Sequence, residues 1–558
     1  MNAILLAVVG LAAFAIGYGV YSRFVATTIY RLDPNFKTPS HELEDGVDYV
    51  PTNRFVLWGH HFTSVAGAAP IVGPAIAVIW GWLPAFLWVV LGTIFFAGVH
   101  DFGALWASVR NRARSVGALT EDIVGKRARS LFMIVIFLVL LMVNAVFAIV
   151  IANLFVDFPS SVAPTWIVIA VALVVGYLLY RRGVGLLWPS VGALVVLYLF
   201  LGVGQVLPIS LPDGVFGLAP NGLWVIVLFT YAFIASLLPV WLLLQPRDYV
   251  NGLQLFIGLG ILYLAILLAN PTVVAPAINP NPPTDVPPLV PLLFVTIACG
   301  AISGFHGLVA SGTTSKQLDK ETDARFVGYL GSSGEGALAL ATVIACTAGF
   351  ASLGDWEGVY SSFAAGGAST FVQGGAAIIN QGLGIPTAFA ATLLSVMVVL
   401  FAATTMDTGV RLQRYIIQEW GTIYNLPVLG KGWVATGLAV AACVALAFGA
   451  GEGGGTGGLV IWPLFGATNQ LLAGLTLLVI TVFLRKLGRP TIYTLLPMVF
   501  LVVMTVMALF IQLGTFWQQQ NWLLVSMGTL ILIAAIWVSL ESFSAFYRAR
   551  QGATQPGD

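Results

Sequence analysis

The sequence predicts an all-α polytopic membrane protein with about fifteen spanning helices, and its composition, apolar runs and charge placement support this class. Of the 558 residues, 59% are hydrophobic and only 8% are charged, a balance unsuited to a water-exposed surface of this size. Apolar runs of about twenty residues recur along the chain, and each is long enough to cross a hydrocarbon core of roughly 30 Å as a helix. They do not alternate polar and apolar residues, which excludes a β-barrel.

Hydropathy and the positions of Gly, Pro and charged residues predict where each span begins and ends. The first span has no basic residue before it, so we expect a retained helix and not a cleaved signal peptide. The expected spans are 2–24, 54–80, 83–109, 130–155, 163–180, 185–207, 220–245, 249–270, 290–313, 327–350, 384–406, 432–449, 458–484, 490–513 and 522–547.

Basic residues fall on one predicted side of the membrane. When the cluster from Arg110 to Arg129 is taken as cytoplasmic, alternation of the spans places all 24 Lys and Arg residues on that side. A miscounted span would have scattered them. The pattern therefore predicts an odd number of spans, with the N-terminus outside and the C-terminus in the cytoplasm.

Two expected outer segments are longer than simple connections. Residues 271–289 are rich in proline, so we expect an extended loop that caps the outer surface. Residues 351–383 are rich in glycine and only half apolar. They are too interrupted to span but long enough for an amphipathic or re-entrant segment, and we expect a lid there.

Two expected spans contain helix-breaking residues. In the span that starts at 54, the breakers are Gly67, Pro70, Gly73 and Pro74; in the span that starts at 220, Pro239 is near the middle. Unpaired backbone groups are costly in hydrocarbon, so interrupted helices persist beside protein or a water-filled cavity. The alternative is that Gly and Pro serve packing and kinking alone.

The two interruptions open two five-helix sets that cross the membrane in opposite directions. This is the arrangement of an inverted repeat, with a substrate site expected where the broken helices meet. The predicted organisation is a peripheral helix (1–24), a cytoplasmic loop (25–53), a first repeat (54–207), a second repeat (220–406) and C-terminal helices (432–547).

Ionisable residues inside spans are costly and so are candidates for coupling transport to an ion. A histidine paired with a carboxylate could relay a proton, although a structural histidine in a polar packing seam is an equal alternative for each. For Asp407, the simpler interpretation is structural: an i, i+4 ion pair with Arg411 on the same helix. The other candidates are His60, His61, His100, Asp101, His306 and Glu335.

A sodium ion is the rival coupling ion. Hydroxyls of Ser311, Thr313 and Thr314 end one expected span and offer the oxygen ligands that hard cations prefer, together with carbonyls released at Ala66 and Gly67. A hydroxyl-rich helix end is also compatible with capping or packing alone.

Redox enzymes are a poor match. Five histidines are too few for several haem and copper centres, and there is no CxxCH or flavin fingerprint, so we expect no cofactor, no other metal and no enzyme activity. Cys299, Cys346 and Cys443 lie singly in apolar runs, as small core residues do. A net charge of +1 gives no reason to expect a nucleic-acid partner.

Several long motifs carry a family resemblance: "WGHHFTSVAGAAPIVGP", "GVHDFGALWASVRNRARSVG", "LPVWLLLQPRDYVNGLQ", "GFHGLVASGTTSKQ", "TTMDTGVRLQRYIIQE" and "IWPLFGATNQLLAGLTL". They resemble the carbon-starvation protein A (CstA) family of bacterial inner-membrane transporters over nearly the whole chain. The resemblance implies uptake of pyruvate or peptides during starvation, driven by protons, and kinship to the amino-acid transporter superfamily built on inverted five-helix repeats.

These observations together predict a secondary active importer, first for pyruvate or a similar carboxylate and alternatively for short peptides. A channel or a starvation sensor fits less well, because the chain supplies two inverted halves and no soluble signalling domain. Exposed amides of half-helices would favour a carboxylate. We expect it at His61, Ser64, Ala66, Gly67, Ala68, Ala69, Ser236, Leu237 and Leu238.

Overall fold

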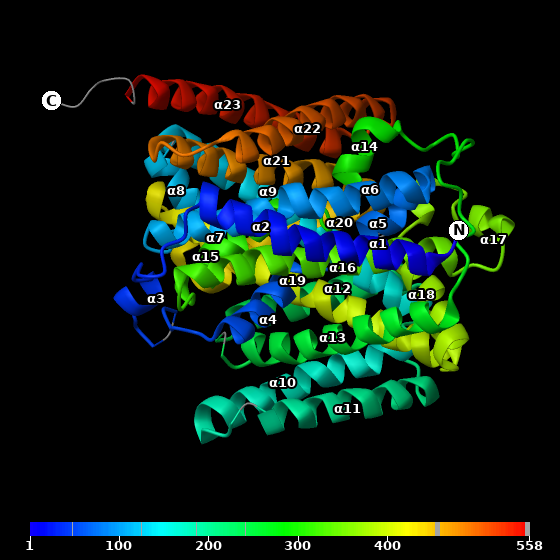
Figure 1. Cartoon of the computed structure of the whole chain (residues 1–558). Coiled ribbons are helices and arrows are strands. Elements are labelled where there is room, and N and C mark those ends of the chain that lie inside the picture. The colour runs from blue at the N-terminus through cyan, green and yellow to red at the C-terminus, as the bar shows by residue number, and fades with distance from the viewer. Residues whose placement is uncertain (47, 124, 186, 240, 452–457, 553–558) are drawn as a thin grey trace.

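A computed structural model describes the chain except for residues 47, 124, 186, 240, 452–457 and 553–558. Its described part is almost entirely helical and has no β-strand beyond two isolated bridges. The helices run roughly side by side (Figure 1). They are α1 (Ala3–Ile16), α2 (Ser22–Phe24), α3 (Pro39–Glu42), α4 (Arg54–Val65), α5 (Ala69–Ala77), α6 (Trp82–Gly92), α7 (Gly98–Arg110), α8 (Val116–Ile123), α9 (Lys126–Asp157), α10 (Val162–Arg182), α11 (Leu187–Val206), α12 (Pro220–Leu237), α13 (Leu244–Ala269), α14 (Leu289–Thr296), α15 (Gly304–Gly312), α16 (Leu330–Ala348), α17 (Leu353–Val359), α18 (Ala368–Leu383), α19 (Thr387–Ile423), α20 (Gly432–Gly449), α21 (Gly458–Lys486), α22 (Ile492–Gln518) and α23 (Trp522–Gly552).

Thirteen helical segments of the described chain are long and apolar enough to cross a membrane, and fourteen if one bent pair counts as a span. That pair is Arg54–Val65 and Ala69–Trp80, bent by 51°. The expected span 290–313 is divided into α14 and α15, of 8 and 9 residues, so it is not counted. The polytopic membrane class is therefore supported, while the expected count of about fifteen is not confirmed.

The long helices form a buried centre and two outer pairs. The most apolar windows of α19 and α21 are each 94% buried inside the protein, whereas that of α11 is 28% buried. α9 packs along α19 and α21, and Figure 1 shows α22 with α23 on one outer side and α10 with α11 on the opposite side. The outer pairs present apolar residues outward, as a lipid-facing helix does.

The interrupted span at Gly67 is confirmed, whereas the one expected at Pro239 is wrong. α4 ends at Val65 and α5 begins at Ala69, so a short non-helical stretch divides this span. α12 instead ends at Leu237, and Pro239 lies in the connection to α13. The second interruption lies between α14 and α15, around Gly300.

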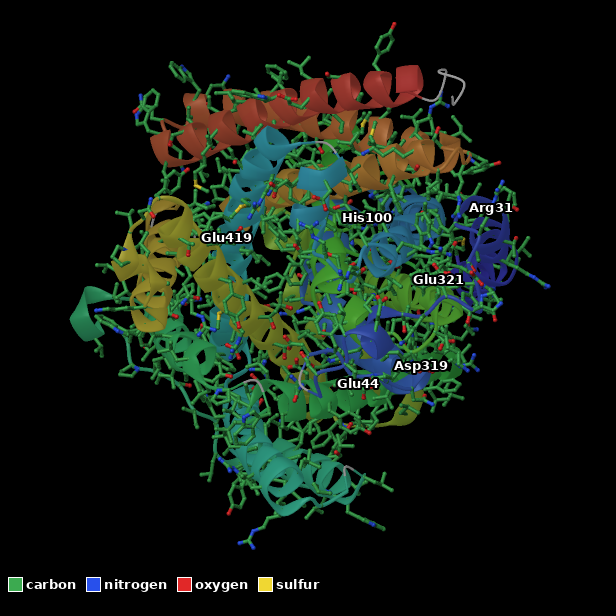
Figure 2. All side chains as sticks on the ribbon, turned by 90° about the vertical axis from the view of Figure 1, so that its left-hand side faces the viewer. Arg31, Glu44, His100, Asp319, Glu321 and Glu419 are labelled. Carbon is green, nitrogen blue, oxygen red and sulfur yellow. The ribbon has the colours of Figure 1, made fainter. Side chains whose placement is uncertain are left out.

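The expected cytoplasmic loop 25–53 docks onto the segment between α15 and α16. Thr52 and Leu318 form an isolated parallel bridge, and His41 contacts Asp319 at 2.7 Å. Glu321 accepts a hydrogen bond from the Asp33 amide. Figure 2 looks onto this end of the molecule, where α3 lies, while Figure 1 shows the N-terminus and α17 at the other end.

Candidate functional site

Helix α5, which follows the first interruption, packs directly against the second interruption. A Cβ atom added at Gly73 of α5 would lie 2.5 Å from the carbonyl oxygen of Thr296, where α14 ends. A Cβ at Gly300 would lie 3.3 Å from the Cβ of Pro70. Glycine at these two positions lets the backbones approach closely. The structure therefore packs α5, the helix that follows the first interruption, against the second interruption, more than 200 residues away in sequence.

Side chains from two helices, α6 and α21, hold the backbone of the second interruption. The indole nitrogens of Trp462 and Trp88 each donate to a carbonyl oxygen at 3.1 Å, those of Thr296 and Ile297 respectively. At the start of α15, the side-chain oxygen of Asn469 accepts a hydrogen bond from the Phe305 amide. These bonds satisfy backbone groups that the broken helix leaves without partners.

A chain of buried ionisable side chains lies directly beside this interruption. The Oδ1 of Asp101 lies 2.7 Å from His100 Nδ1, and its Oδ2 lies 2.8 Å from His306 Nδ1. The other ring nitrogen of His306 lies 3.2 Å from Glu335. Ser332 donates a hydrogen bond to Asp101 at 2.6 Å. We call these five residues the His306 network; its side chains are almost completely buried.

The His306 network is built to hold a proton. Both ring nitrogens of His306 face carboxylates, so each contact is a hydrogen bond only if the imidazole is doubly protonated or a carboxyl group carries the proton. Burial makes a net charge costly, and it couples protonation of the two carboxylates to that of the imidazole. Four of the expected candidates, His100, Asp101, His306 and Glu335, therefore meet in one cluster.

His60 and His61 lie outside this cluster. His61 Nδ1 lies 2.9 Å from the hydroxyl oxygen of Thr314, and its ring packs against Gly331 of α16. The carbonyl of His60 accepts a hydrogen bond from Ser64 at 2.8 Å. His61 is fully buried, whereas the adjacent His60 is half-buried, so the two side chains have different surroundings.

The hydroxyls expected to bind sodium already have protein partners. Ser311 donates to the Gly307 carbonyl at 2.6 Å and accepts from the Val116 amide, and Thr313 donates to the Val309 carbonyl. Thr314 contacts His61, as described above. Sequence reasoning missed a hydroxyl on α19: the Oγ1 of Thr405 would lie 2.8 Å from a Cβ at Gly67, and it is buried without a partner among the described residues.

The amides expected to be exposed at Ser236–Leu238 are not available there. α12 ends at Leu237, so this end presents carbonyl groups, and the Leu238 amide donates to Ile234. Arg411 donates to the Ala235 and Leu238 carbonyls, and Arg414 donates to the Ser236 carbonyl at 2.6 Å. This end of α12 therefore attracts cations, which it obtains from α19. At the start of α5, the amides of Ala68 and Ala69 have no partner among the described residues, whereas the Ala66 and Gly67 amides, also expected to be exposed, donate to the Phe62 and Val65 carbonyls.

A second buried ionic cluster joins α12, α13 and α19. Arg247, expected in a cytoplasmic loop, is only 1% exposed and pairs with Asp407 and Asp248. Tyr231 donates to Asp407 at 2.8 Å and accepts from Arg247 at 2.7 Å. The expected i, i+4 pairing of Asp407 with Arg411 is therefore wrong, because Arg411 is directed to backbone carbonyls.

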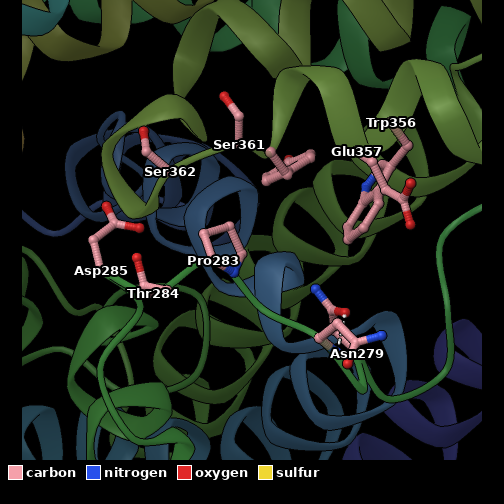
Figure 3. Close-up of a pocket in the computed structure, with 10 residues that line it drawn as sticks. Asn279, Pro283, Thr284, Asp285, Trp356, Glu357, Ser361 and Ser362 are labelled. Carbon is pink, nitrogen blue, oxygen red and sulfur yellow. Dashed lines mark hydrogen bonds between the residues drawn. The ribbon is translucent and has the colours of Figure 1, made fainter.

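A cavity of about 710 Å³ lies at the end of the molecule that carries α17 (Figure 3). Its walls come from the proline-rich segment near Asn279 and from the glycine-rich segment at Trp356–Ser362. The Tyr360 hydroxyl donates to the Ala75 carbonyl at 2.7 Å, which ties this wall to α5. Burial raises the pKa of Tyr360 well above its ordinary value, so the hydroxyl keeps the proton that it donates.

The described residues contain no group of three or more His, Cys, Asp or Glu side chains placed to hold a metal ion. Cys299, Cys346 and Cys443 are buried and free, as expected of core residues.

Comparison with known proteins decides the family. The family model for carbon starvation protein CstA matches residues 2–354 and 355–508. The chain belongs to the CstA family. The Campylobacter jejuni peptide transporter CstA is 35% identical, with 90% of this chain and 79% of that protein covered. The Escherichia coli pyruvate/proton symporter BtsT is 31% identical, with coverages of 92% and 82%.

The CstA-family chain also resembles a solved transporter structure. A crystal structure of the Eremococcus coleocola manganese transporter aligns with a TM-score of 0.51 and covers 91% of this chain and 99% of that chain. Sequence identity is 14%, so the similarity concerns the fold alone. Family and fold together identify this protein as a multi-pass membrane transporter.

Proposed function

We propose that this CstA-family transporter imports a small solute that carries a carboxylate, and that protons drive the import. Pyruvate is the first candidate and short peptides are the alternative; relatives named for each cover most of this chain. We place the protein in the inner membrane, with the N-terminus outside and the C-terminus in the cytoplasm. The one-sided distribution of its 24 basic residues supports this orientation.

The His306 network carries the proposal of proton coupling. His306 extends from α15, Asp101 from α7 and Glu335 from α16, so the network crosses the helices that surround the second interruption. Protonation changes the net charge of the buried cluster to which these three helices contribute side chains. A proton taken up here therefore favours one arrangement of α15 against α7 and α16 over another, which is the differential interaction that a coupled transporter needs.

The packing supports an inverted repeat with boundaries other than the expected 54–207 and 220–406. We propose a first repeat at 54–269, with α10 and α11 inserted, and a second at 289–486, with α17 and α18 inserted. Each repeat then opens with an interrupted span, α4–α5 or α14–α15. The pairs correspond: α16 and α13 pack against α4, whereas α7 and α21 pack against α15.

The solute carboxylate is proposed to bind at the first turn of α5. This turn begins at Ala69, after the non-helical residues Ala66–Ala68. Pro70 has no N–H group, and Ile71 and Val72 donate to the Ala68 carbonyl, so the amides that have no partner among the described residues are those of Ala68 and Ala69. A helix N-terminus favours an anion. Ser64 and His61, at the end of α4, are the adjacent side chains, and Ser236–Leu238 leave the proposed site because of the carbonyls they present.

Uptake into proteoliposomes tests the proposal. Labelled pyruvate and labelled alanyl-alanine are supplied under an inward proton gradient without sodium, and under an inward sodium gradient at equal pH. The proposal requires accumulation of at least one solute under the proton gradient alone. Accumulation that needs sodium and ignores the proton gradient would reject proton coupling in favour of the sodium alternative.

A further inference from the structure

A segment that we call the strap is hydrogen-bonded to the connection between α15 and α16, at the end of the molecule that carries α3. The strap comprises residues 31–46 and 48–53. The Ser40 hydroxyl donates to the Leu318 carbonyl at 2.7 Å, and the Thr38 hydroxyl donates to the Asp319 carbonyl at 3.0 Å. Both acceptors belong to the backbone, so the strap fixes the path of the connection itself. The side chain of Leu318 is completely buried.

Glu321 joins the strap and the connection to α7. This side chain is 1% exposed and accepts a hydrogen bond from the Asp33 amide of the strap. Arg110, the last residue of α7, donates two hydrogen bonds to the same carboxylate. Its guanidinium also lies over the ring of Phe36 in the strap, 4.4 Å from the centroid. A buried, fully paired carboxylate is costly to separate from its partners, so this contact holds the strap in place.

The strap therefore contacts the ends of the three helices that form the His306 network. Arg110 belongs to α7, and the connection joins α15 to α16. Within the connection, the Thr314 hydroxyl lies 2.9 Å from His61, a proposed solute ligand, and both residues are fully buried. The docked strap thus fixes the connection against His61. Figure 2 looks onto this end, with Glu321 and Asp319 labelled, whereas the cavity beside α17 lies at the opposite end.

We propose that the strap closes this end of the transporter and must leave the connection before a solute at the first interruption can depart there. Movement of α15 against α7 shifts the connection relative to the strap. Hydrogen-bond lengths vary by only about 0.5 Å, so the contacts to Leu318 and Asp319 break under a larger shift. Packed contacts of this kind switch between discrete arrangements. The inference rests on the proposed import function and adds a conformational control to it.

The accessibility of a thiol beneath the strap measures undocking without any solute. In Leu318→Cys the thiol replaces a fully buried side chain, and the native cysteines are buried as well. N-ethylmaleimide should label it roughly tenfold or more slowly than Glu44→Cys, an exposed position of the strap. Ser40→Ala removes one hydrogen bond and should speed labelling of Leu318→Cys roughly fivefold. His41→Gln, which alters a solvent-accessible contact, should leave the rate nearly unchanged.

A disulfide between strap and connection tests whether undocking is needed for transport. Thr52 and Leu318 are bridge partners, and such residues have Cα atoms about 5 Å apart, within disulfide range. Oxidised Thr52→Cys with Leu318→Cys should lose exchange of labelled pyruvate and alanyl-alanine roughly tenfold or more, and dithiothreitol should restore it. The matched control is Asn2→Cys with Thr272→Cys, the bridge at the N-terminal end of Figure 1, which should exchange equally when oxidised and reduced.

A second readout uses the single variant Leu318→Cys in proteoliposomes. Solute exchange should speed its labelling, because each cycle exposes the connection. The inference would be overturned by parent-level exchange in the oxidised strap variant, by labelling as fast as at Glu44→Cys, or by labelling that ignores both exchange and Ser40→Ala. Exchange and labelling need no proton gradient, so failure of proton-driven uptake would reject the proposed coupling and leave these results intact.

Discussion

The Nδ1 atom of His306 lies 2.8 Å from the Oδ2 atom of Asp101, in a contact that joins α15 to α7. Glu335 contacts the opposite nitrogen of the same ring from α16. A single imidazole therefore connects the helix that follows the second interruption to two neighbouring helices. Loss or gain of one proton there changes both contacts together, and the proposed coupling depends on this arrangement.

Substitution at Gly67 tests the first interruption. Gly67→Leu should abolish solute exchange, because its Cβ alone would lie 2.8 Å from Thr405 Oγ1 and 3.1 Å from the Phe147 ring. Overpacking of this kind costs about 1–3 kcal/mol, so folding is checked by size-exclusion chromatography. Gly59→Leu on α4, the helix that precedes the interruption, is the control, because a Cβ there meets no atom within 4 Å. Normal exchange by folded Gly67→Leu would place the pathway elsewhere.

The ionic cluster of Arg247 and Asp407 predicts a stability effect. Arg247→Gln leaves a buried carboxylate without its cation and should lower the free energy of unfolding by about 3–5 kcal/mol. The double variant Arg247→Gln with Asp407→Asn should recover part of that loss. Thermal unfolding in detergent measures both. If Arg247→Gln were as stable as the parent, the pair would not hold α13 to α19. The same conclusion would follow if the double variant lost more stability than the two single variants lose together.

The orientation of the chain can be checked by labelling intact cells. Cysteines introduced at Ser160 and Thr284 should react with an impermeant reagent from outside, and one at Ser115 should not. This expectation follows from the predicted placement of all 24 basic residues on one side of the membrane, taken as cytoplasmic. Reaction at Ser115, with none at the other two positions, would reverse the topology.

The sequence could predict the helices and the first interruption because both depend on local features. Apolar length determines a span, and Gly67 with Pro70 disfavours a continuous helix. Gly73 and Pro74, which were also expected to interrupt this span, lie inside α5. The prediction at Pro239 was wrong because the residues after it are apolar. Hydropathy alone therefore cannot distinguish a kink within a span from the end of a helix. The residues between α14 and α15 include no proline, and only Gly300 and Ser303 indicate in the sequence that the helix is interrupted there.

The four ionisable members of the His306 network could be named from the sequence, but neither Ser332 nor the meeting of the four could be predicted. Asp101 and His306 are 205 residues apart, and no periodicity relates them. The same limit explains the error at Asp407: its neighbour Arg411 is a helical turn away, whereas its true partner, Arg247, is 160 residues distant. Sequence spacing predicts ion pairs between residues on one helix. Only the tertiary packing shows whether a side chain pairs with such a neighbour or with a residue distant in sequence.

Proton-driven uptake by the His306→Gln variant is the most direct test of proton coupling through the His306 network. Glutamine keeps polar atoms in place of the ring but cannot carry the proton. Parent and variant are compared in proteoliposomes, in uptake under a proton gradient and in solute exchange without one. His41→Gln, which alters the solvent-accessible contact with Asp319, is the control. We expect proton-driven accumulation by His306→Gln to fall roughly tenfold or more while its solute exchange is retained, and we expect His41→Gln to keep both activities. Full proton-driven accumulation by folded His306→Gln would contradict it.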